Sequence, residues 1–295
     1  MKLANWRQLS DRGHDLVLCL DYPGGRAAAG FAELAAGVPA DASFLHIRQA
    51  AAGPLAVCVN RWVAECTATG RPVRAVLGFC AGAALATRVA DAIAATTPPP
   101  MVVLFDSLSP TGDSLAGQFT SALESSARHL TADELADARG LAEQLVATYP
   151  DDLPRIAAGL TGRYDQLMRA VADRLSLPAF LREELTSGFT AYLDYLLLAG
   201  EGGLDMRATT PLFLNSADQE PPPEGARAIT LDIGHDDLLR DPEVHKLVTD
   251  LLTGEHPWLP RPRYPRYCPR IPLCAEPRPR SCATTGGTWR SRPLN

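Results

Sequence analysis

The chain has 295 residues, 46% of them hydrophobic, and a formal net charge of -6 from 28 Lys and Arg against 34 Asp and Glu. This length and apolar content are enough for a large α/β domain and exclude wholesale disorder. A net negative charge gives no support for nucleic-acid binding, which needs a basic surface. No apolar run reaches the roughly 18 to 20 residues of a membrane span, and residues 1–13 lack a signal-peptide core. We therefore expect a cytoplasmic protein with no membrane partner.

Strand and helix patterns alternate over much of the chain. Short apolar runs typical of buried strands cover 14–20, 42–47, 73–77 and 101–105, and helical patterns cover 56–69 and the segment up to residue 95. The alternation resumes later with strand patterns at 211–215 and 228–233 and a closing helix at 242–252. Alternation of this kind predicts a mostly parallel sheet with helices on both faces.

Residues 112–203 interrupt this alternation with four amphipathic helical segments and no strand pattern. One of these segments begins with Thr131 and has Glu134 three positions later, which is a capping-box pattern. We expect a helical lid over the active-site edge of a single domain spanning 1–256, since strand patterns resume afterwards. A separate helical domain is the alternative. The segment 257–295 holds nine of the 25 prolines and eight arginines, so we expect it to be a disordered tail.

The most informative motif is Gly78-Phe79-Cys80-Ala81-Gly82, between an expected strand and an Ala-rich helix. It matches the nucleophile-elbow pattern of α/β-hydrolases, G-x-S-x-G, with cysteine in the place of serine. Gly78 and Gly82 are needed because a β-carbon there would collide with the neighbouring strand or helix. The N–H of Ala81, at the start of the helix, would face the oxygen of an attacked carbonyl. A buried structural cysteine between two glycines is the alternative, but the flanking strand and helix favour catalysis.

A cysteine nucleophile needs a base, and the base needs a third group to orient it. Of the six histidines, His235 follows the last expected strand on a Gly-containing loop, and the other five have positions typical of surface or packing residues. Two acids end strands at the same edge, Asp106 and Asp218, and hydrolases of this fold use both places. We expect Asp236, which adjoins the histidine in sequence, to cap a helix instead.

The remaining cysteines do not suggest a disulfide framework or a metal site. There are seven in all, an odd number with irregular spacing and no C-x-x-C pair. Cys19 lies in an apolar run and is expected in the core. We therefore predict no metal and no bound cofactor.

The segments FDSLSP, at 105–110, and GHDDLLRDPEV, at 234–244, resemble the acyl-carrier thioesterases of nonribosomal-peptide and polyketide assembly lines. The likeness covers about residues 16–252. It implies an α/β-hydrolase fold and a triad of Cys80, Asp106 and His235. It also implies a thioester substrate on the phosphopantetheine arm of an acyl or peptidyl carrier protein. The family usually has Ser at position 80, and Pro23 stands where its first loop usually supplies an oxyanion N–H, so Gly24 or Tyr22 would donate instead.

Two other hypotheses remain at this stage. Dienelactone hydrolases also carry cysteine in G-x-C-x-G and take their acid from the later strand, which would select Asp218, but they lack so large a helical insertion. A non-catalytic acyl-binding protein is the third possibility. Retention of the elbow glycines with a candidate acid and base favours an enzyme. An acyl-cysteine intermediate is compatible with hydrolysis, cyclisation or transfer to an amine.

Overall fold

The computed structural model describes residues 3–22, 29–48, 53–204, 210–222 and 224–255. The expected tail at 257–295 and the candidate oxyanion donor Gly24 lie outside these residues. The described part of the chain thus runs from Leu3 to Glu255, with gaps between these ranges.

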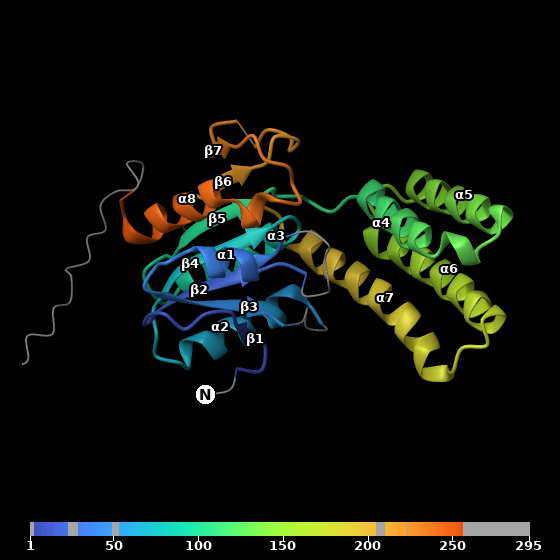
Figure 1. Cartoon of the computed structure of the whole chain (residues 1–295), viewed down its shortest axis with the longest axis horizontal. Helices are drawn as coiled ribbons and strands as arrows, with labels where there is room; N and C mark the ends of the chain where they lie inside the picture. Colours follow the sequence, from blue (N-terminus) through green and yellow to red (C-terminus); the bar gives the residue numbers. More distant parts are fainter. Residues whose placement is uncertain (1–2, 23–28, 49–52, 205–209, 223, 256–295) are drawn as a thin grey trace, which may run out of the picture. The chain divides into compact units, whose positions relative to one another are not determined.

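A seven-stranded sheet forms the centre of this part (Figure 1), in the order β1-β3-β2-β4-β5-β6-β7. Only the pairing of β1 with β3 is antiparallel, and the other five pairings are parallel. The central strands are buried on both faces, which suits their runs of Val, Leu and Phe. The strands are β1 (Trp6–Gln8), β2 (Asp15–Leu20), β3 (Ala42–Ile47), β4 (Val73–Phe79), β5 (Met101–Phe105), β6 (Leu212–Asn215) and β7 (Arg227–Thr230).

Helices cover both faces of the sheet, and side-chain alternation along each strand supplies the two cores. In β2, Leu16 and Leu18 belong to one apolar cluster, and Val17 and Cys19 belong to the other. The first cluster includes residues of α2 (Leu55–Thr67) and α3 (Gly82–Ala94). The second includes residues of α1 (Phe31–Gly37), the 3-10 helix η2 (Leu238–Arg240) and α8 (Pro242–Thr253).

The insertion between β5 and β6 is entirely helical among the described residues. It consists of α4 (Gly112–Ser125), the short η1 (Ala127–His129), α5 (Ala132–Thr148), α6 (Leu153–Arg174) and α7 (Ala179–Gly202). The side chains of Thr111, Thr131 and Asp152 cap three of these helices. The capping box expected at Thr131 and Glu134 is confirmed, since each residue bonds the other's backbone N–H.

Helix α7 joins the insertion to the elbow side of the sheet. It packs on α6 and α4 of the insertion and on α3 and α2 beside the sheet. The carbonyl groups of Gly202 and Gly203 accept hydrogen bonds from Arg88 and Thr87 of α3. A β-carbon at Gly202 would lie 2.8 Å from the carbonyl oxygen of Ala84, so glycine permits this close contact.

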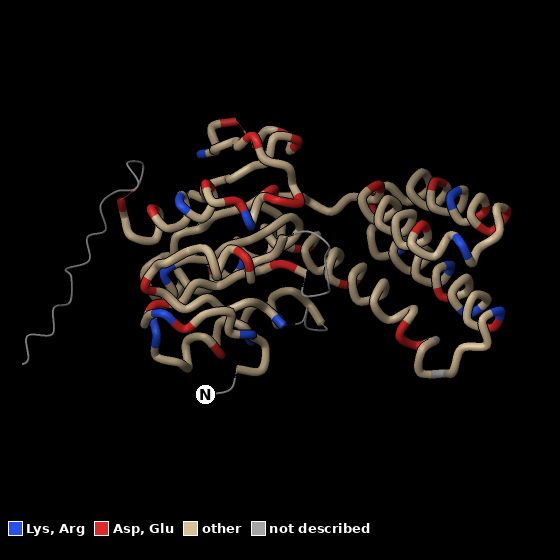
Figure 2. The backbone as a smooth tube through the Cα atoms, in the orientation of Figure 1, with Lys and Arg blue, Asp and Glu red and all other residues tan. Residues whose placement is uncertain are grey.

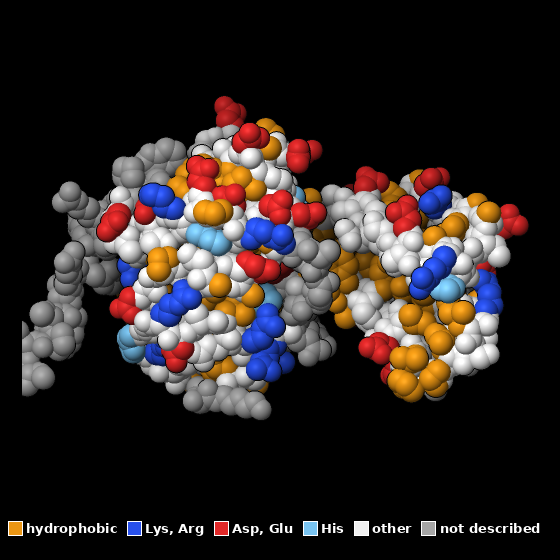
Figure 3. All heavy atoms as spheres, viewed as in Figure 1, with side chains coloured by type: hydrophobic (Ala, Val, Ile, Leu, Met, Phe, Trp, Pro, Cys, Tyr) orange, Lys and Arg blue, Asp and Glu red, His pale blue; other side chains and the backbone are white. Residues whose placement is uncertain are grey.

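Charged and apolar side chains are distributed differently over these elements. Figure 2 shows acidic and basic residues interspersed over the helices flanking the sheet and over the insertion. Figure 3 shows apolar side chains gathered at the turn between α6 and α7, where Leu175 is 44% exposed and Phe180 is 68% exposed. No helix in the described residues combines the length and apolar character needed to cross a membrane.

The predicted fold class is confirmed. The mostly parallel sheet, helices on both faces, Cys80 in the sharp turn between β4 and α3, and the helical insertion after β5 together constitute an α/β-hydrolase fold. One strand and one α-helix were not anticipated. Both are short: β1 has three residues and α1 has seven, so neither contains enough periods to give a pattern. The strand expected at 228–233 ends at Thr230, and the chain leaves regular pairing before His235.

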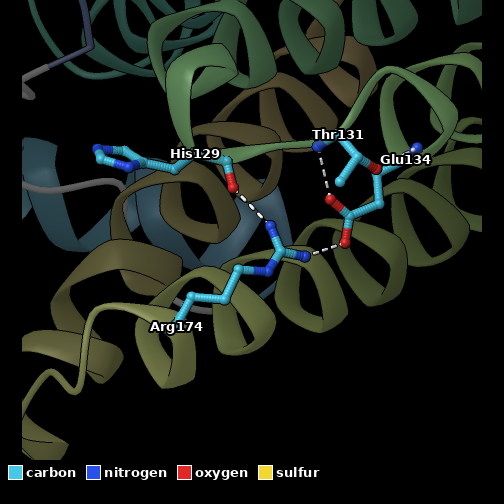
Figure 4. Close-up of polar contacts among 4 residues, drawn as sticks. All are labelled: His129, Thr131, Glu134 and Arg174. Atoms are coloured by element: carbon cyan, nitrogen blue, oxygen red, sulfur yellow. Dashed lines mark hydrogen bonds and ion pairs between the residues drawn. The ribbon is translucent and has the colours of Figure 1, made fainter.

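An ion pair ties the start of α5 to the end of α6 (Figure 4). The guanidinium of Arg174 donates to the carbonyl oxygen of His129 and to the carboxylate of Glu134. The backbone N–H of Thr131 donates to the other oxygen of the same carboxylate at 2.8 Å. The hydrogen bond from Thr131 and then the contact with Arg174 hold the pKa of Glu134 below its ordinary value.

This tie predicts an acid-dependent contribution to stability. Because the folded-state pKa of Glu134 is lowered, its stabilisation is present above the unfolded pKa of about 4.3 and is lost as the pH falls through the folded pKa. The pair is partly exposed, so Glu134→Gln should cost less than about 1 kcal/mol at neutral pH. Urea unfolding at several pH values should show that this cost shrinks as the pH falls below the unfolded pKa. The control is Glu143→Gln, at an exposed position of the same helix. A pH-independent cost for Glu134→Gln would contradict the assignment.

Candidate active site

Cys80 occupies a sharp turn between β4 and α3. Its φ is 53°, in the left-handed region that non-glycine residues rarely adopt. Its N–H donates to the carbonyl of Phe105 at 2.9 Å, and its own carbonyl accepts from Ala83 at 3.1 Å and from Leu108 at 3.2 Å. These bonds join the turn to β5 and α3 and hold the strained backbone. The cysteine is partly exposed, unlike Cys19, which is fully buried.

The two elbow glycines lie where no side chain fits. A β-carbon at Gly82 would lie 2.2 Å from the carbonyl oxygen of Leu20, and one at Gly78 would lie 2.6 Å from the Cα of Ala83. Both neighbours are backbone atoms of packed elements, so neither can move aside cheaply. The glycines therefore permit α3 to lie directly against β2 and β4, which sets the position of Cys80 at the sheet edge.

Asp106 and His235 lie together at the same edge. Asp106 follows β5 with a φ of 41°, and its side chain is buried. The Nδ1 atom of His235 lies 2.7 Å from Oδ2 of Asp106, and the N–H of Ser216 donates to Oδ1 at 2.6 Å. Both carboxylate oxygens are therefore hydrogen-bonded. This pairing leaves Nε2 of the imidazole as the ring nitrogen available for proton transfer.

The structure does not bring the alternative acid to the histidine. Asp218 lies in the exposed turn after β6, while Asn215 and Ser216 occupy the buried positions just before it. The expectation for Asp236 was wrong. Asp241 caps α8, accepting from the N–H of Glu243, and Asp236 is exposed before η2 with its carbonyl accepting from Ala29. The 3-10 helix η2 between Asp236 and α8 explains the difference, because it places the start of α8 five residues further on.

The structure favours one of the three candidate oxyanion donors and disfavours a second, while the third is not described. Ala81 is buried and directly precedes α3, where backbone N–H groups have no partner within the helix. The N–H of Tyr22 donates to Oδ1 of Asp21 at 2.7 Å, which weighs against it as an oxyanion donor. Gly24, the other expected donor, is outside the described residues. Ala81 therefore remains the candidate donor, next to Cys80 in sequence and at the start of α3.

A tyrosine cluster connects the insertion to this edge. Tyr22 follows β2, and its ring lies against Tyr192 and Tyr195 of α7, at centroid distances of 4.7 Å and 5.4 Å. The hydroxyl of Tyr22 donates to the carbonyl of Gly188 at 3.2 Å. The Tyr195 hydroxyl lies 2.9 Å from the point that a β-carbon on Gly82 would occupy. Helix α7 thus contacts both the chain after β2 and the first turn of α3.

The other thiols and the strand histidine have the properties of packing residues. Burial raises the pKa of Cys19, and burial with the nearby Glu65 raises the pKa of Cys66 to about 12. Burial, helped by the charge of Arg7, lowers the pKa of His46 to about 4, so it is neutral in β3. The four described cysteines form no disulfide, and no metal-binding group of three His, Cys, Asp or Glu occurs among the described residues.

Sequence analysis missed three features of this site. The N–H of Ser216, the ring of Phe79 against His235 at 4.9 Å between centroids, and the tyrosine cluster all depend on tertiary contacts. Phe79 lay inside the elbow motif, at a position where the pattern accepts any residue. The backbone donor could not have been identified from residue type at all.

A scan against protein-family models and a search of curated proteins each find no match. Among solved structures, the chain is similar to the Vlm2 thioesterase domain bound with a dodecadepsipeptide, at 17% identity and a TM-score of 0.45, over 86% of this chain and 98% of that one. It is also similar to homoserine O-acetyltransferase from Staphylococcus aureus, at 13% identity and 0.45, over 87% and 90%. A lipase-esterase related protein from Clostridium acetobutylicum gives 11% identity and 0.45, over 84% and 99%. At such identities, function has to be argued from the site.

The elbow geometry predicts a strong effect of one added methyl group. Gly82→Ala should lower the free energy of unfolding by about 2 kcal/mol or more, because the new β-carbon overlaps the backbone of Leu20. Gly117→Ala in α4 is the matched control, since no atom lies within 4 Å of its β-carbon, and it should gain about 0.5 to 1 kcal/mol. Denaturant unfolding measures both. Equal effects of the two variants would refute this account of the elbow.

Proposed function

We propose that this protein is a cysteine-dependent thioesterase or acyltransferase, with Cys80 as nucleophile, His235 as base and Asp106 as orienting acid. The hydrogen bond of 2.7 Å between His235 Nδ1 and Asp106 Oδ2 carries the proposal. It fixes the imidazole at the edge of the sheet where the adjacent strand ends in the strained turn of Cys80. Strained residues at the edge of a rigid sheet are typical of catalytic positions.

The reaction begins with proton transfer from Cys80 Sγ to Nε2 of His235. The thiolate attacks the thioester carbonyl, and the backbone N–H of Ala81 stabilises the resulting oxyanion. Collapse breaks the original C–S bond, the imidazolium returns the proton to the departing thiol, and an acyl-S-Cys80 intermediate remains. Asp106 keeps the imidazole in one tautomer and stabilises its cation throughout. His235 then deprotonates water, a hydroxyl or an amine, which releases the acyl group.

Cysteine in place of serine affects the second half of this reaction. Exchange of one thioester for another is nearly isoenergetic, whereas a serine ester would lose part of the activation of the acyl group. The intermediate on Cys80 stays reactive toward amines and toward ring closure. Transfer and cyclisation are therefore as compatible with this site as hydrolysis is.

The proposed substrate is an acyl or peptidyl chain on the phosphopantetheine arm of a carrier protein, and the proposed location is the cytoplasm. Two features support this substrate: the likeness of FDSLSP and GHDDLLRDPEV to carrier thioesterases, and the insertion whose helix α7 contacts Tyr22 at the site edge. The substrate would bring its own prosthetic arm, so the mechanism uses no bound cofactor of the enzyme.

The two other hypotheses receive less support from the site. A dienelactone-hydrolase-like enzyme would use Asp218, which is exposed in a turn while Asp106 is hydrogen-bonded to His235. A non-catalytic acyl-binding protein would have no need for a carboxylate with both oxygens bonded and a histidine paired to it. Such polar arrangements are costly to bury and persist where they serve a purpose.

The choice of acid predicts a contrast between two variants. On one acyl thioester, Asp106→Ala should lose roughly three or more decades in kcat/KM, because the imidazole loses its orienting partner. Asp218→Ala, which removes an equivalent carboxylate at the exposed turn, should stay within about threefold of the parent. Steady-state kinetics compares them. A large loss confined to Asp218→Ala would instead favour the dienelactone-hydrolase alternative.

The identity of the nucleophile predicts a change in products. Cys80→Ser preserves the geometry but converts the intermediate into a less activated ester. It should still be acylated, and should shift the product ratio from amine transfer or cyclisation toward hydrolysis or a stalled acyl-enzyme. Chromatography of products formed with and without an added amine measures the ratio. An unchanged ratio would mean that sulfur confers no special outcome and that the enzyme is an ordinary hydrolytic thioesterase.

A further inference from the structure

The ring of Phe79 packs against the ring of His235. The ring centroids are 4.9 Å apart and the ring planes are inclined by 37°. Phe79 is fully buried and belongs to the apolar cluster between the sheet and helices α1 and α8, whereas the side chain of His235 is 36% exposed. The imidazole therefore has one rigid apolar neighbour on the side of the core.

The position of Phe79 is fixed by the sheet. It is the last residue of β4, it pairs with Phe105 of β5, and the next N–H along the chain, that of Cys80, donates to the Phe105 carbonyl. Its side chain points to the same face as Ala75 and Leu77, in keeping with the alternation of a strand. The ring is fully buried in a close-packed apolar cluster, which restrains its rotamer, so it is a stable surface for another side chain.

The hydrogen bond to Asp106 and the contact with Phe79 constrain His235 in different ways. The bond from Nδ1 to Asp106 fixes one ring atom, but an imidazole can still pivot about the axis of that bond. His235 itself lies in the loop after β7, outside regular pairing. Contact with an aromatic ring restricts the plane of the imidazole and hence the direction of Nε2. The Phe79 ring also lies within the roughly 6 Å at which an aromatic face attracts a cation, and the imidazole becomes one during catalysis.

We propose that Phe79 is a positioning residue that fixes the plane of His235 and so sets the approach of Nε2 to Cys80. This inference rests on the proposed function of the site. Phe79 and Cys80 are consecutive residues, so one short piece of backbone carries both the nucleophile and the surface against which the base packs. The spacing of nucleophile and base is then determined locally, at the end of β4, and does not depend on the long path through the insertion. The elbow pattern accepts any residue before the nucleophile, and in this chain Phe79 at that position orients the base.

The test compares Phe79→Leu with Phe44→Leu. Phe44 is an equally buried phenylalanine of the same apolar cluster, on β3, so its replacement controls for the loss of a core ring. The first readout is the rate at which iodoacetamide alkylates Cys80, followed by peptide mapping over a range of pH. This readout needs His235 to assist thiolate formation but needs no acyl substrate, so it is independent of whether the thioesterase proposal is correct. The second readout is the single-turnover rate of acylation by an acyl-pantetheine thioester.

Phe79→Leu should move the alkylation profile to higher pH and slow acylation by roughly 10- to 100-fold, with the thioester concentration that gives the half-maximal single-turnover rate changed by less than about twofold. Phe44→Leu should lose a similar amount of thermal stability while keeping the parent profile and rate. If Phe79→Leu keeps the parent alkylation profile, or if both variants shift it equally, Phe79 is only a core residue and the inference is overturned. Should Phe79→Leu fail to fold, Phe79→Met, which keeps more of the volume but not the flat face, is tested in the same way. A parent protein that alkylates as expected but never acylates would contradict the proposed function and leave the positioning role supported.

Discussion

The site depends on one backbone constraint, the left-handed turn at Cys80. A non-glycine residue in this conformation costs on the order of 1 to 2 kcal/mol, so the turn persists only because its surroundings hold it. Backbone bonds to β5 and α3 and the close approach of α3 to β2 provide that hold. This close approach of α3 requires Gly78 and Gly82. The two glycines are therefore needed to hold the sulfur of Cys80 at the sheet edge. Asp106, which follows the next strand, also has a left-handed backbone conformation, with a φ of 41°.

The parallel sheet converts these local turns into a site. Adjacent parallel strands end at the same edge of a sheet. The pairing of β4 with β5 therefore suffices to place Cys80 and Asp106 near each other. The histidine arrives from the loop after β7 and is held by the carboxylate and the ring of Phe79. Helix α7 reaches the same edge from the insertion through Tyr192 and Tyr195. The three candidate catalytic residues therefore all lie at the edge of the sheet, and under the proposed function the insertion supplies a neighbouring surface on which substrate selection can vary.

The sequence was informative where a residue type or a period is required by geometry. The elbow glycines, the buried strands and the paired Thr131 and Glu134 follow from backbone sterics, burial and capping, and each is present in the structure. Strand positions alone left Asp106 and Asp218 open, because both follow strands at the same edge and only packing decides which one is buried. The resemblance of FDSLSP to carrier thioesterases selected Asp106, and the structure pairs this residue with His235. Sequence analysis mistook Asp236 for a helix cap, because the short η2 gives no sequence signal. It could not foresee that the Tyr22 N–H bonds to Asp21, since that depends on a side-chain rotamer.

The claim that unites these observations is that Cys80 forms a covalent bond to an acyl group. Intact-protein mass spectrometry after incubation with acyl-carrier thioesters tests it most directly, followed by peptide mapping of the adduct. The account predicts a gain of one acyl mass on the peptide that contains Cys80, and no gain in Cys80→Ala. The same adduct in Cys80→Ala, or turnover of the thioester by that variant at the rate of the parent, would contradict it.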